Sequence, residues 1–154
     1  MKKAKLVLAN FDARIPNISI RPKNVSTKVT ISCKMYDASL KVEKLVKIVF
    51  TGVAAVDFRI NYFDNMIGAE AFGLYQIEDK VFIEKLVREI FERRKEIYLL
   101  EGHYDYDENE PADLLNVMDL YGDFTKDMDS YSAYIQNVDA GVYIIVAKEM
   151  KVMG

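Results

Sequence analysis

The chain has 154 residues, of which 51% are hydrophobic and 29% are charged, and this composition predicts one folded domain over residues 1–154. Its single Cys excludes a disulfide framework and a cysteine-based zinc site, and it makes a reducing cytoplasm the expected location. Taken over the whole chain, the net charge of −3 gives no reason to expect nucleic-acid binding.

The first 24 residues predict a short strand followed by a loop. The apolar run Leu6–Ala9 is too short for the ~7–15 apolar residues of a signal peptide, so we expect a first strand there. No stretch of the chain approaches the ~18 uncharged apolar residues of a membrane span. Residues 14–24 contain Pro16 and Pro22, and they predict a loop around a brief extended piece at Ile18–Ile20.

Residues 27–35 show the clearest strand pattern, because apolar and polar residues alternate strictly along them. Cys33 falls on the apolar side and is expected to be a small buried side chain. A turn is predicted over Asp37–Leu40. Two further strands follow at 42–50 and 56–62, separated by a bulge or turn at Thr51–Gly52, and another is predicted at 71–77.

A long amphipathic helix is predicted over residues 79–95, and residues 97–100 suit either a strand or the tail of this helix. Asp79 can act as its N-cap, and apolar residues recur at three- and four-residue spacing from Phe82 to Phe91. Glu84 with Arg88 and Glu89 with Arg93 suit i,i+4 pairs on the solvent side. The cluster Arg93-Arg94-Lys95 is interpreted as a solvated helix end, with a phosphate site as the alternative.

The remaining elements complete an α+β fold. A short helix is predicted at about 111–121, and a closing hairpin joins strands 131–138 and 142–147 through a turn at Asp139–Gly141. Because most strands have one polar face, we expect a mainly antiparallel sheet or an incomplete β-sandwich, partly covered by the long helix.

Charge is unevenly distributed along the chain. Residues 1–100 carry 18 basic and 12 acidic residues, whereas residues 101–140 carry 11 acidic residues and one Lys. The acidic part also holds five Tyr, and we expect residues 101–130 to form an acidic, Tyr-rich excursion from the domain. Such a surface can steer and bind a basic protein, although it can also serve only to keep the chain soluble. The candidate partner-binding residues are Tyr104, Asp105, Tyr106, Asp107, Glu108, Glu110, Asp113, Tyr121 and Asp123.

Metal and catalytic motifs are weak. Oxygen-bearing side chains from Asp105 to Asp113 resemble the opening of a calcium loop, but Glu110 stands where that loop needs Gly and Asn116 where it needs Glu. Weak calcium binding of another kind remains an alternative. His103 lies two residues before Asp105, and no known nucleophile, zinc or phosphate-loop motif accompanies it. We therefore expect no enzyme, no cofactor and no metal site.

Three segments share motifs with a known group of proteins. A Phe-x-Gly-Val pattern lies in Val49–Val53, and Gly73–Asp79 leads directly into the amphipathic helix. Tyr134–Lys148 combines a Tyr-rich strand, an Asp-containing turn and a strand of Val, Ile and Ala. Together these segments resemble small acidic bacterial immunity-protein-like families associated with polymorphic toxin systems. The resemblance implies an inhibitor of a cognate toxin, and it transfers no functional residues.

The first functional hypothesis is a non-enzymatic cytoplasmic binding module, an immunity-type inhibitor whose partner is a basic protein such as a toxin or a nucleic-acid-binding protein. The alternative is a homo-oligomeric structural or chaperone-like module, because long apolar strands have edges that must be covered. A hydrolase that uses His103 and nearby carboxylates is a third hypothesis.

Overall fold

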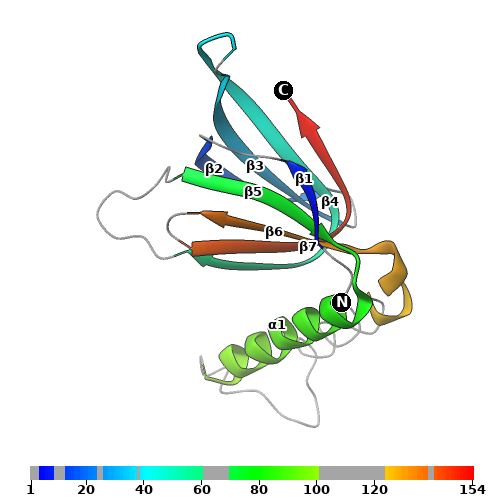
Figure 1. The fold of residues 1–154 in the computed structure, drawn as a ribbon. Coiled ribbons are helices and arrows are strands. Elements are labelled where there is room, and N and C mark those ends of the chain that lie inside the picture. Colours follow the sequence, from blue (N-terminus) through cyan, green and yellow to red (C-terminus); the bar gives the residue numbers. More distant parts are fainter. Residues whose placement is uncertain are drawn as a thin grey trace.

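The computed structural model describes residues 4–8, 13–23, 26–37, 39–60, 70–100, 124–138 and 141–154. These residues form seven strands, one long helix and a short 3-10 helix, which confirms the predicted α+β class (Figure 1). In chain order the elements are β1 (Lys5–Leu8), β2 (Ala13–Lys23), β3 (Ser26–Asp37), β4 (Val42–Ile60), β5 (Glu70–Ile77), α1 (Lys80–Leu100), η1 (Met128–Ser130), β6 (Ser132–Val138) and β7 (Gly141–Met153).

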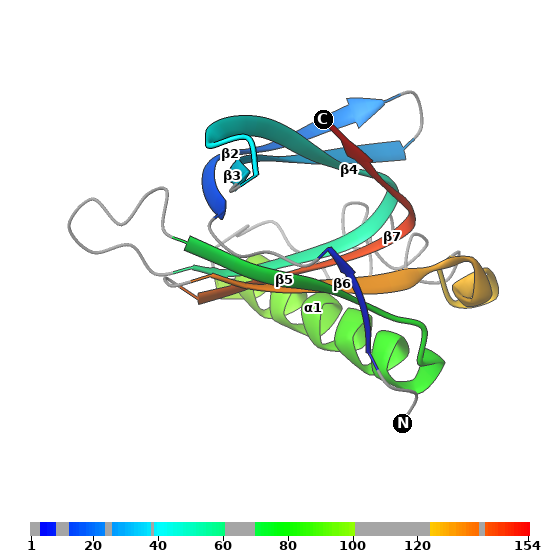
Figure 2. The ribbon, with the colours of Figure 1, turned by 45° about the horizontal axis from the view of Figure 1, so that its top comes forward.

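All strand pairs between the described elements are antiparallel, in the order β1-β5-β2-β3-β4-β7-β6. An additional pairing of β5 with β6 shows that the sheet is strongly curved. Figures 1 and 2 show two leaflets connected by the long strands β4 and β7. We call β2, β3 and the adjoining parts of β4 (42–50) and β7 (150–153) the upper leaflet. The lower leaflet contains β5, β6 and the remaining parts of β4 (53–60) and β7 (141–147).

β4 passes from one leaflet to the other at Gly52, where the sequence predicts a bulge or a turn. Gly52 has a φ of 61°, and the pairing of β4 with β7 shifts register between Val53 and Ala55. An added Cβ on Gly52 would lie 3.0 Å from Cγ of Lys148 on β7. The prediction of separate strands at 42–50 and 56–62 is wrong, because an irregularity of this kind bends a strand without ending its pairing.

Alternation along the strands sends side chains into two cores. The first core lies between the leaflets and contains Val29, Ile31, Cys33, Ile48, Phe50, Leu74, Tyr134, Val138, Tyr143, Ile145 and Ala147. The second lies between the lower leaflet and α1 and contains Ile83, Leu86, Val87, Phe124, Ala133 and Val146. In β7, successive residues from Tyr143 to Ala147 alternate between these two cores. The lower leaflet is thus apolar on both faces, whereas the upper leaflet has one solvent-facing side.

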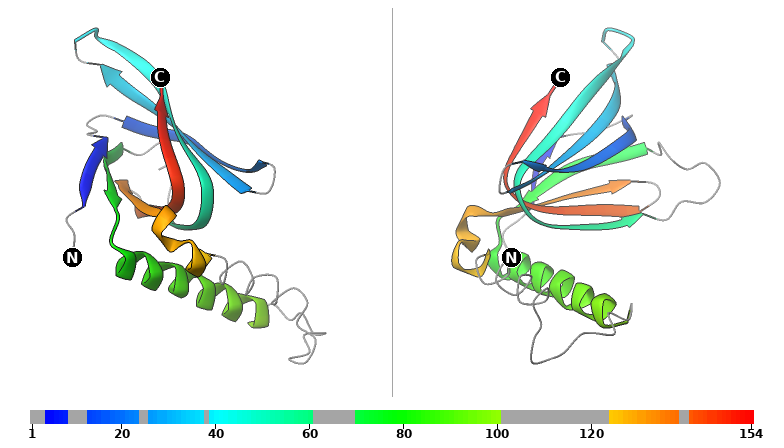
Figure 3. Two further views of the ribbon diagram at one scale, coloured as in Figure 1. Left: turned by 90° about the vertical axis from the view of Figure 1, so that its right-hand side faces the viewer. Right: turned by 180° about the vertical axis from the view of Figure 1, so that it is seen from behind.

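α1 covers the lower leaflet, on the side away from the upper leaflet (Figure 3). Its predicted cap is confirmed, because the backbone N–H of Phe82 donates a hydrogen bond to Oδ1 of Asp79 at 3.1 Å. The helix ends at Leu100, five residues beyond the predicted end at Lys95. The interpretation of Arg93-Arg94-Lys95 as a helix end is therefore wrong, since more than a full turn follows them.

β2 is the largest error of the sequence analysis, because residues 13–23 form a strand where a loop was predicted. β2 pairs with β3 along most of its length, but with β5 only at Ala13 and Arg14. The rest of its second edge has no strand partner among the described residues, and a strand with a free edge tolerates Pro16 and Pro22.

The other predicted strands are confirmed, and the closing hairpin is extended at its end. β1 and β5 lie where strands were predicted, and β6 and β7 form the predicted hairpin, although β7 continues to Met153. The predicted helix at 111–121 and the end of the strand predicted at 56–62 lie outside the described residues. None of the described helices is both long enough and apolar enough to span a membrane.

Candidate functional site

The predicted partner-binding residues, from Tyr104 to Asp123, all lie outside the described residues, as do His103 and the calcium-like pattern. Residues 101–123, which we call the acidic segment, carry eight Asp and Glu and no Lys or Arg. The described residues have the opposite balance, with 19 Lys and Arg against 13 Asp and Glu, a net charge of +6. The chain therefore separates its charge between the acidic segment and a basic scaffold.

Both attachment points of the acidic segment belong to the α1 side of the molecule. The segment follows Leu100, the last residue of α1, and precedes Phe124, whose side chain is 4% exposed in the second core. Phe124 also packs against the Tyr131 ring, with 5.0 Å between the ring centroids. Burial of an aromatic side chain is worth roughly 1.5–3 kcal/mol, so the scaffold holds the chain firmly where the acidic segment ends.

Polar contacts around η1 reinforce this second attachment point. Asp127 accepts a hydrogen bond from Ser130 at 2.6 Å and forms a salt bridge with Lys148 of β7 at 2.7 Å. Both contacts favour the charged carboxylate, so they lower the pKa of Asp127, and the same salt bridge raises the pKa of Lys148. The Lys148 ammonium also lies 5.3 Å from the centroid of the Tyr131 ring. These contacts join residues 127–131 to the sheet.

A buried carboxylate links α1 to the lower leaflet. The Asp57 side chain, on β4, is 5% exposed and forms salt bridges with Arg59 at 2.9 Å and with Arg93 of α1 at 3.4 Å. The bond to Asp57 is also the main cause of the raised pKa of Arg59. Arg93 is thus committed to an internal ion pair, which weakens the phosphate-site alternative for the Arg93–Lys95 cluster. The predicted Glu84–Arg88 pair is present on the same helix.

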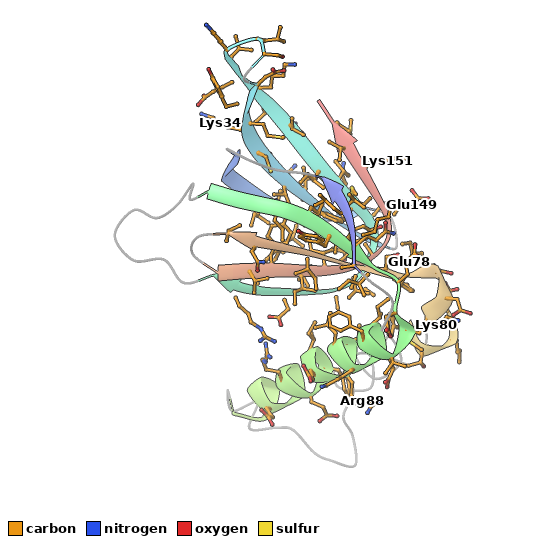
Figure 4. All side chains as sticks on the ribbon, viewed as in Figure 1. Lys34, Glu78, Lys80, Arg88, Glu149 and Lys151 are labelled. Atoms are coloured by element: carbon orange, nitrogen blue, oxygen red, sulfur yellow. The ribbon has the colours of Figure 1, made fainter. Side chains whose placement is uncertain are left out.

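The outer side of the upper leaflet carries a cluster of cations that we call the basic face: Arg21, Lys28, Lys34, Lys47 and Lys151. Residues directly opposite each other on paired strands point to the same side of a sheet. Arg21 is opposite Lys28, and Lys47 is opposite Ser32. Val49 is opposite both Thr30 on β3 and Lys151 on β7, so Lys151 points to this side as well. The odd-numbered β3 residues from Val29 to Cys33 point into the first core, so the even-numbered residues point outward. In Figure 4, Lys34 and Lys151 lie on the upper leaflet, far from Arg88 on α1.

The side chains of Cys33 and Tyr143 in the first core are buried and not accessible to a ligand at the surface. The side chain of Cys33 is fully buried, and desolvation raises the pKa of its thiol to about 11. Tyr143 donates a hydrogen bond to Oε1 of the buried Gln136, and burial holds its phenol pKa well above the usual value. Within the described part of the chain, no group of three or more His, Cys, Asp or Glu could hold a metal ion. Cys33 is therefore a core residue, as predicted.

Comparison with known proteins returns no match: neither a protein-family model, nor a curated protein, nor a solved structure is similar to this chain. The resemblance to immunity-protein-like families consequently stays a prediction from the sequence. Function has to be argued from the chain's own residues.

The basic face was missed by the sequence analysis, although one signal for it was present. The polar side of the predicted strand 27–35 begins with Lys28 and ends with Lys34, which already makes that strand basic on one side. Arg21 and Lys151 are distant in sequence, and only the register of β2 and β7 brings them to the same face.

Proposed function

We propose that this protein is a non-enzymatic cytoplasmic binding protein that uses its acidic segment to capture a basic protein, in the manner of an immunity-type inhibitor. The observation that carries the proposal is the separation of charge: eight carboxylates without a cation in residues 101–123, on a scaffold of net charge +6. Like charges crowded in one segment repel each other, and a cationic partner relieves that repulsion.

The attachment of the acidic segment supports this proposal. Its two ends adjoin Leu100 and Phe124, which belong to a helix and to a core rather than to free termini. Fixing both ends reduces the conformational entropy that the segment loses on binding, compared with a free tail. The Tyr side chains at positions 104, 106 and 121 add large, rigid contact surfaces between the charges.

The test is a capture experiment from lysate of the native host with three baits: the unaltered protein, Asp105→Asn/Asp107→Asn/Glu108→Gln, and a matched control. The control, Glu92→Gln/Glu96→Gln/Glu149→Gln, removes the same number of charges from exposed scaffold positions that form no salt bridge within the described residues. We expect the unaltered protein and the control to capture the same basic protein, and the acidic-segment variant to lose it.

The captured protein then allows a kinetic test. Electrostatic steering accelerates association by about 10–1000-fold, so removing three of eight charges should slow association roughly tenfold at low salt. The difference should disappear at about 1 M salt, where the screening length is about 3 Å. Equal capture and equal association rates for the acidic-segment variant would refute the proposed function.

A further inference from the structure

The basic face is a second charged surface for which the proposed function has no use. Its five cations occupy four neighbouring strands, around a centre that includes Ser19, Thr30 and Ser32. With about 4.8 Å between strands and about 3.4 Å per residue, the cations cover roughly 14 Å by 20 Å. Glu43 and Glu149 lie on the same side: Glu43 is opposite Tyr36, beyond Lys34, and Glu149 precedes Lys151 by two residues on β7.

Seven cations elsewhere on the scaffold have acidic partners. Among the described side chains, salt bridges engage Lys44, Arg59, Lys80, Lys85, Arg88, Arg93 and Lys148. No such salt bridge reaches the five cations of the basic face, and all of them except the half-buried Lys28 are exposed. Lys5 on β1 and Lys41 between β3 and β4 also form no such salt bridge, but the five cations of the basic face share one side of the sheet, where together they favour an anionic ligand.

We propose that the basic face binds the acidic segment of a second copy of the chain. The charges are complementary, with five cations on the face against eight carboxylates in residues 101–123. Among the described residues, the aromatic side chain on this side is Tyr36, which lies beyond Lys34, so the centre offers no ring on which a single-stranded nucleic acid would stack its bases. Exposed Leu45 and Met153 lie opposite Lys34 and Lys47, so a polypeptide that combines carboxylates with apolar side chains fits this face better.

The attachment points of the acidic segment favour an occupant from another molecule. Leu100 ends α1 and Phe124 lies in the second core, whereas the basic face is the outer side of the upper leaflet; Figure 3 shows the lower leaflet between α1 and the upper leaflet. A chain that binds in this way would donate its segment to one neighbour and accept the segment of another. Contacts of this kind are heterologous, so they assemble head to tail and grow with protein concentration.

The test measures the mass of the full-length protein by sedimentation at rising concentration, at about 0.01 M and about 1 M salt. The screening length falls from about 30 Å to about 3 Å between these conditions. At low salt we expect the weight-average mass to rise to at least twice the 17.7 kDa of one chain, and to return to one chain at high salt. A single-chain mass at every concentration and salt would overturn the proposal. The same result is expected if the acidic segment binds the basic face of its own chain, so that case also counts against the proposal.

Charge reversals identify the two surfaces. Lys34→Glu/Lys47→Glu should stay monomeric at low salt, whereas the matched control Lys5→Glu/Lys41→Glu should associate like the unaltered protein. Asp105→Lys/Asp107→Lys should also stay monomeric at low salt. A mixture of the face variant with the segment variant should associate, because the acidic segment of the first can bind the intact basic face of the second.

Three results would overturn the proposal: loss of association in the control, retained association in the face variant, or no association in the mixture. Binding of a single-stranded oligonucleotide by the unaltered protein but not by the face variant, without self-association, would assign the face to nucleic acid instead. This test is independent of the proposed function, because Lys34→Glu/Lys47→Glu leaves the acidic segment intact and should still capture a basic partner.

Discussion

Substitution of Gly52 by Ala tests the bend by which β4 joins the two leaflets. Gly52 has a φ of 61°, a conformation that costs an L-residue about 1–2 kcal/mol, while the stiffer unfolded chain returns about 0.4–1 kcal/mol. The new Cβ would also lie 3.0–3.2 Å from three side-chain carbons of Lys148, which must then move. Moving Lys148 also disturbs its exposed salt bridge with Asp127 and its contact with the Tyr131 ring. We expect a total loss of about 1–2 kcal/mol, of which the positive φ contributes about 1 kcal/mol.

Urea unfolding of Gly52→Ala, Lys148→Ala and the double variant separates the two causes. The Lys148→Ala background removes the contacts with Cγ and Cδ and keeps only that with Cβ at 3.1 Å, so the loss caused by Gly52→Ala should fall towards about 1 kcal/mol, with an unchanged denaturant slope. Gly52→Asn should be milder than Gly52→Ala, because Asn tolerates positive φ. A loss below about 0.5 kcal/mol for Gly52→Ala in the unaltered background would refute the strain argument. Equal losses in both backgrounds would refute the contact with Lys148.

Two further predictions concern the first core. At pH 9 the Cys33 thiol of the folded protein, with its pKa of about 11, should be alkylated at least about 50-fold more slowly than in urea. Because the folded pKa lies above the unfolded value, Cys33 stabilises the fold fully below pH 9, and this contribution declines towards pH 11. In Cys33→Ala, the free energy of unfolding should therefore fall less between pH 9 and pH 11 than in the unaltered protein. Tyr143→Phe removes the donor to Gln136 and should lower the free energy of unfolding by about 1–3 kcal/mol in a denaturant titration; a value near zero would show that another donor replaces it.

The elements that the sequence predicted correctly are those in which one local pattern decides the structure. β3 follows from strict alternation over 27–35, and α1 follows from its cap at Asp79 and its apolar spacing. Both patterns survive folding because each element places its apolar side against a core, β3 in the first and α1 in the second. Local pattern and tertiary packing agree there, so the sequence alone sufficed.

The errors arise where the outcome depends on a neighbour far along the chain. The prolines of β2 predict a loop, because proline is rare inside a sheet. β2 accommodates them because it pairs with β3 on one edge and with β5 only at Ala13 and Arg14 on the other. These pairings cannot be read from residues 13–23 alone. Gly52 allows either a turn or a bulge, and pairing with β7 on both sides of it decides for a continuous strand. The predicted helix end at Lys95 comes too early because Arg93–Lys95 has the composition of a last turn, and of the two alternatives for residues 97–100, strand or helix tail, the structure has the tail.

The candidate surfaces show the same limit in electrostatic terms. A net charge of −3 argues against binding of polyanions only if the charges are mixed over the surface. A partner at contact distance responds to charges within roughly one screening length, about 8 Å at physiological salt, and so it meets either the basic face or the acidic segment. Net charge averages these two and conceals both. Salt alone cannot tell them apart, since it weakens either contact, whereas reversing Lys34 and Lys47 inverts charges on the basic face and leaves the acidic segment unchanged. Those two lysines therefore decide whether the chain has one binding surface or two.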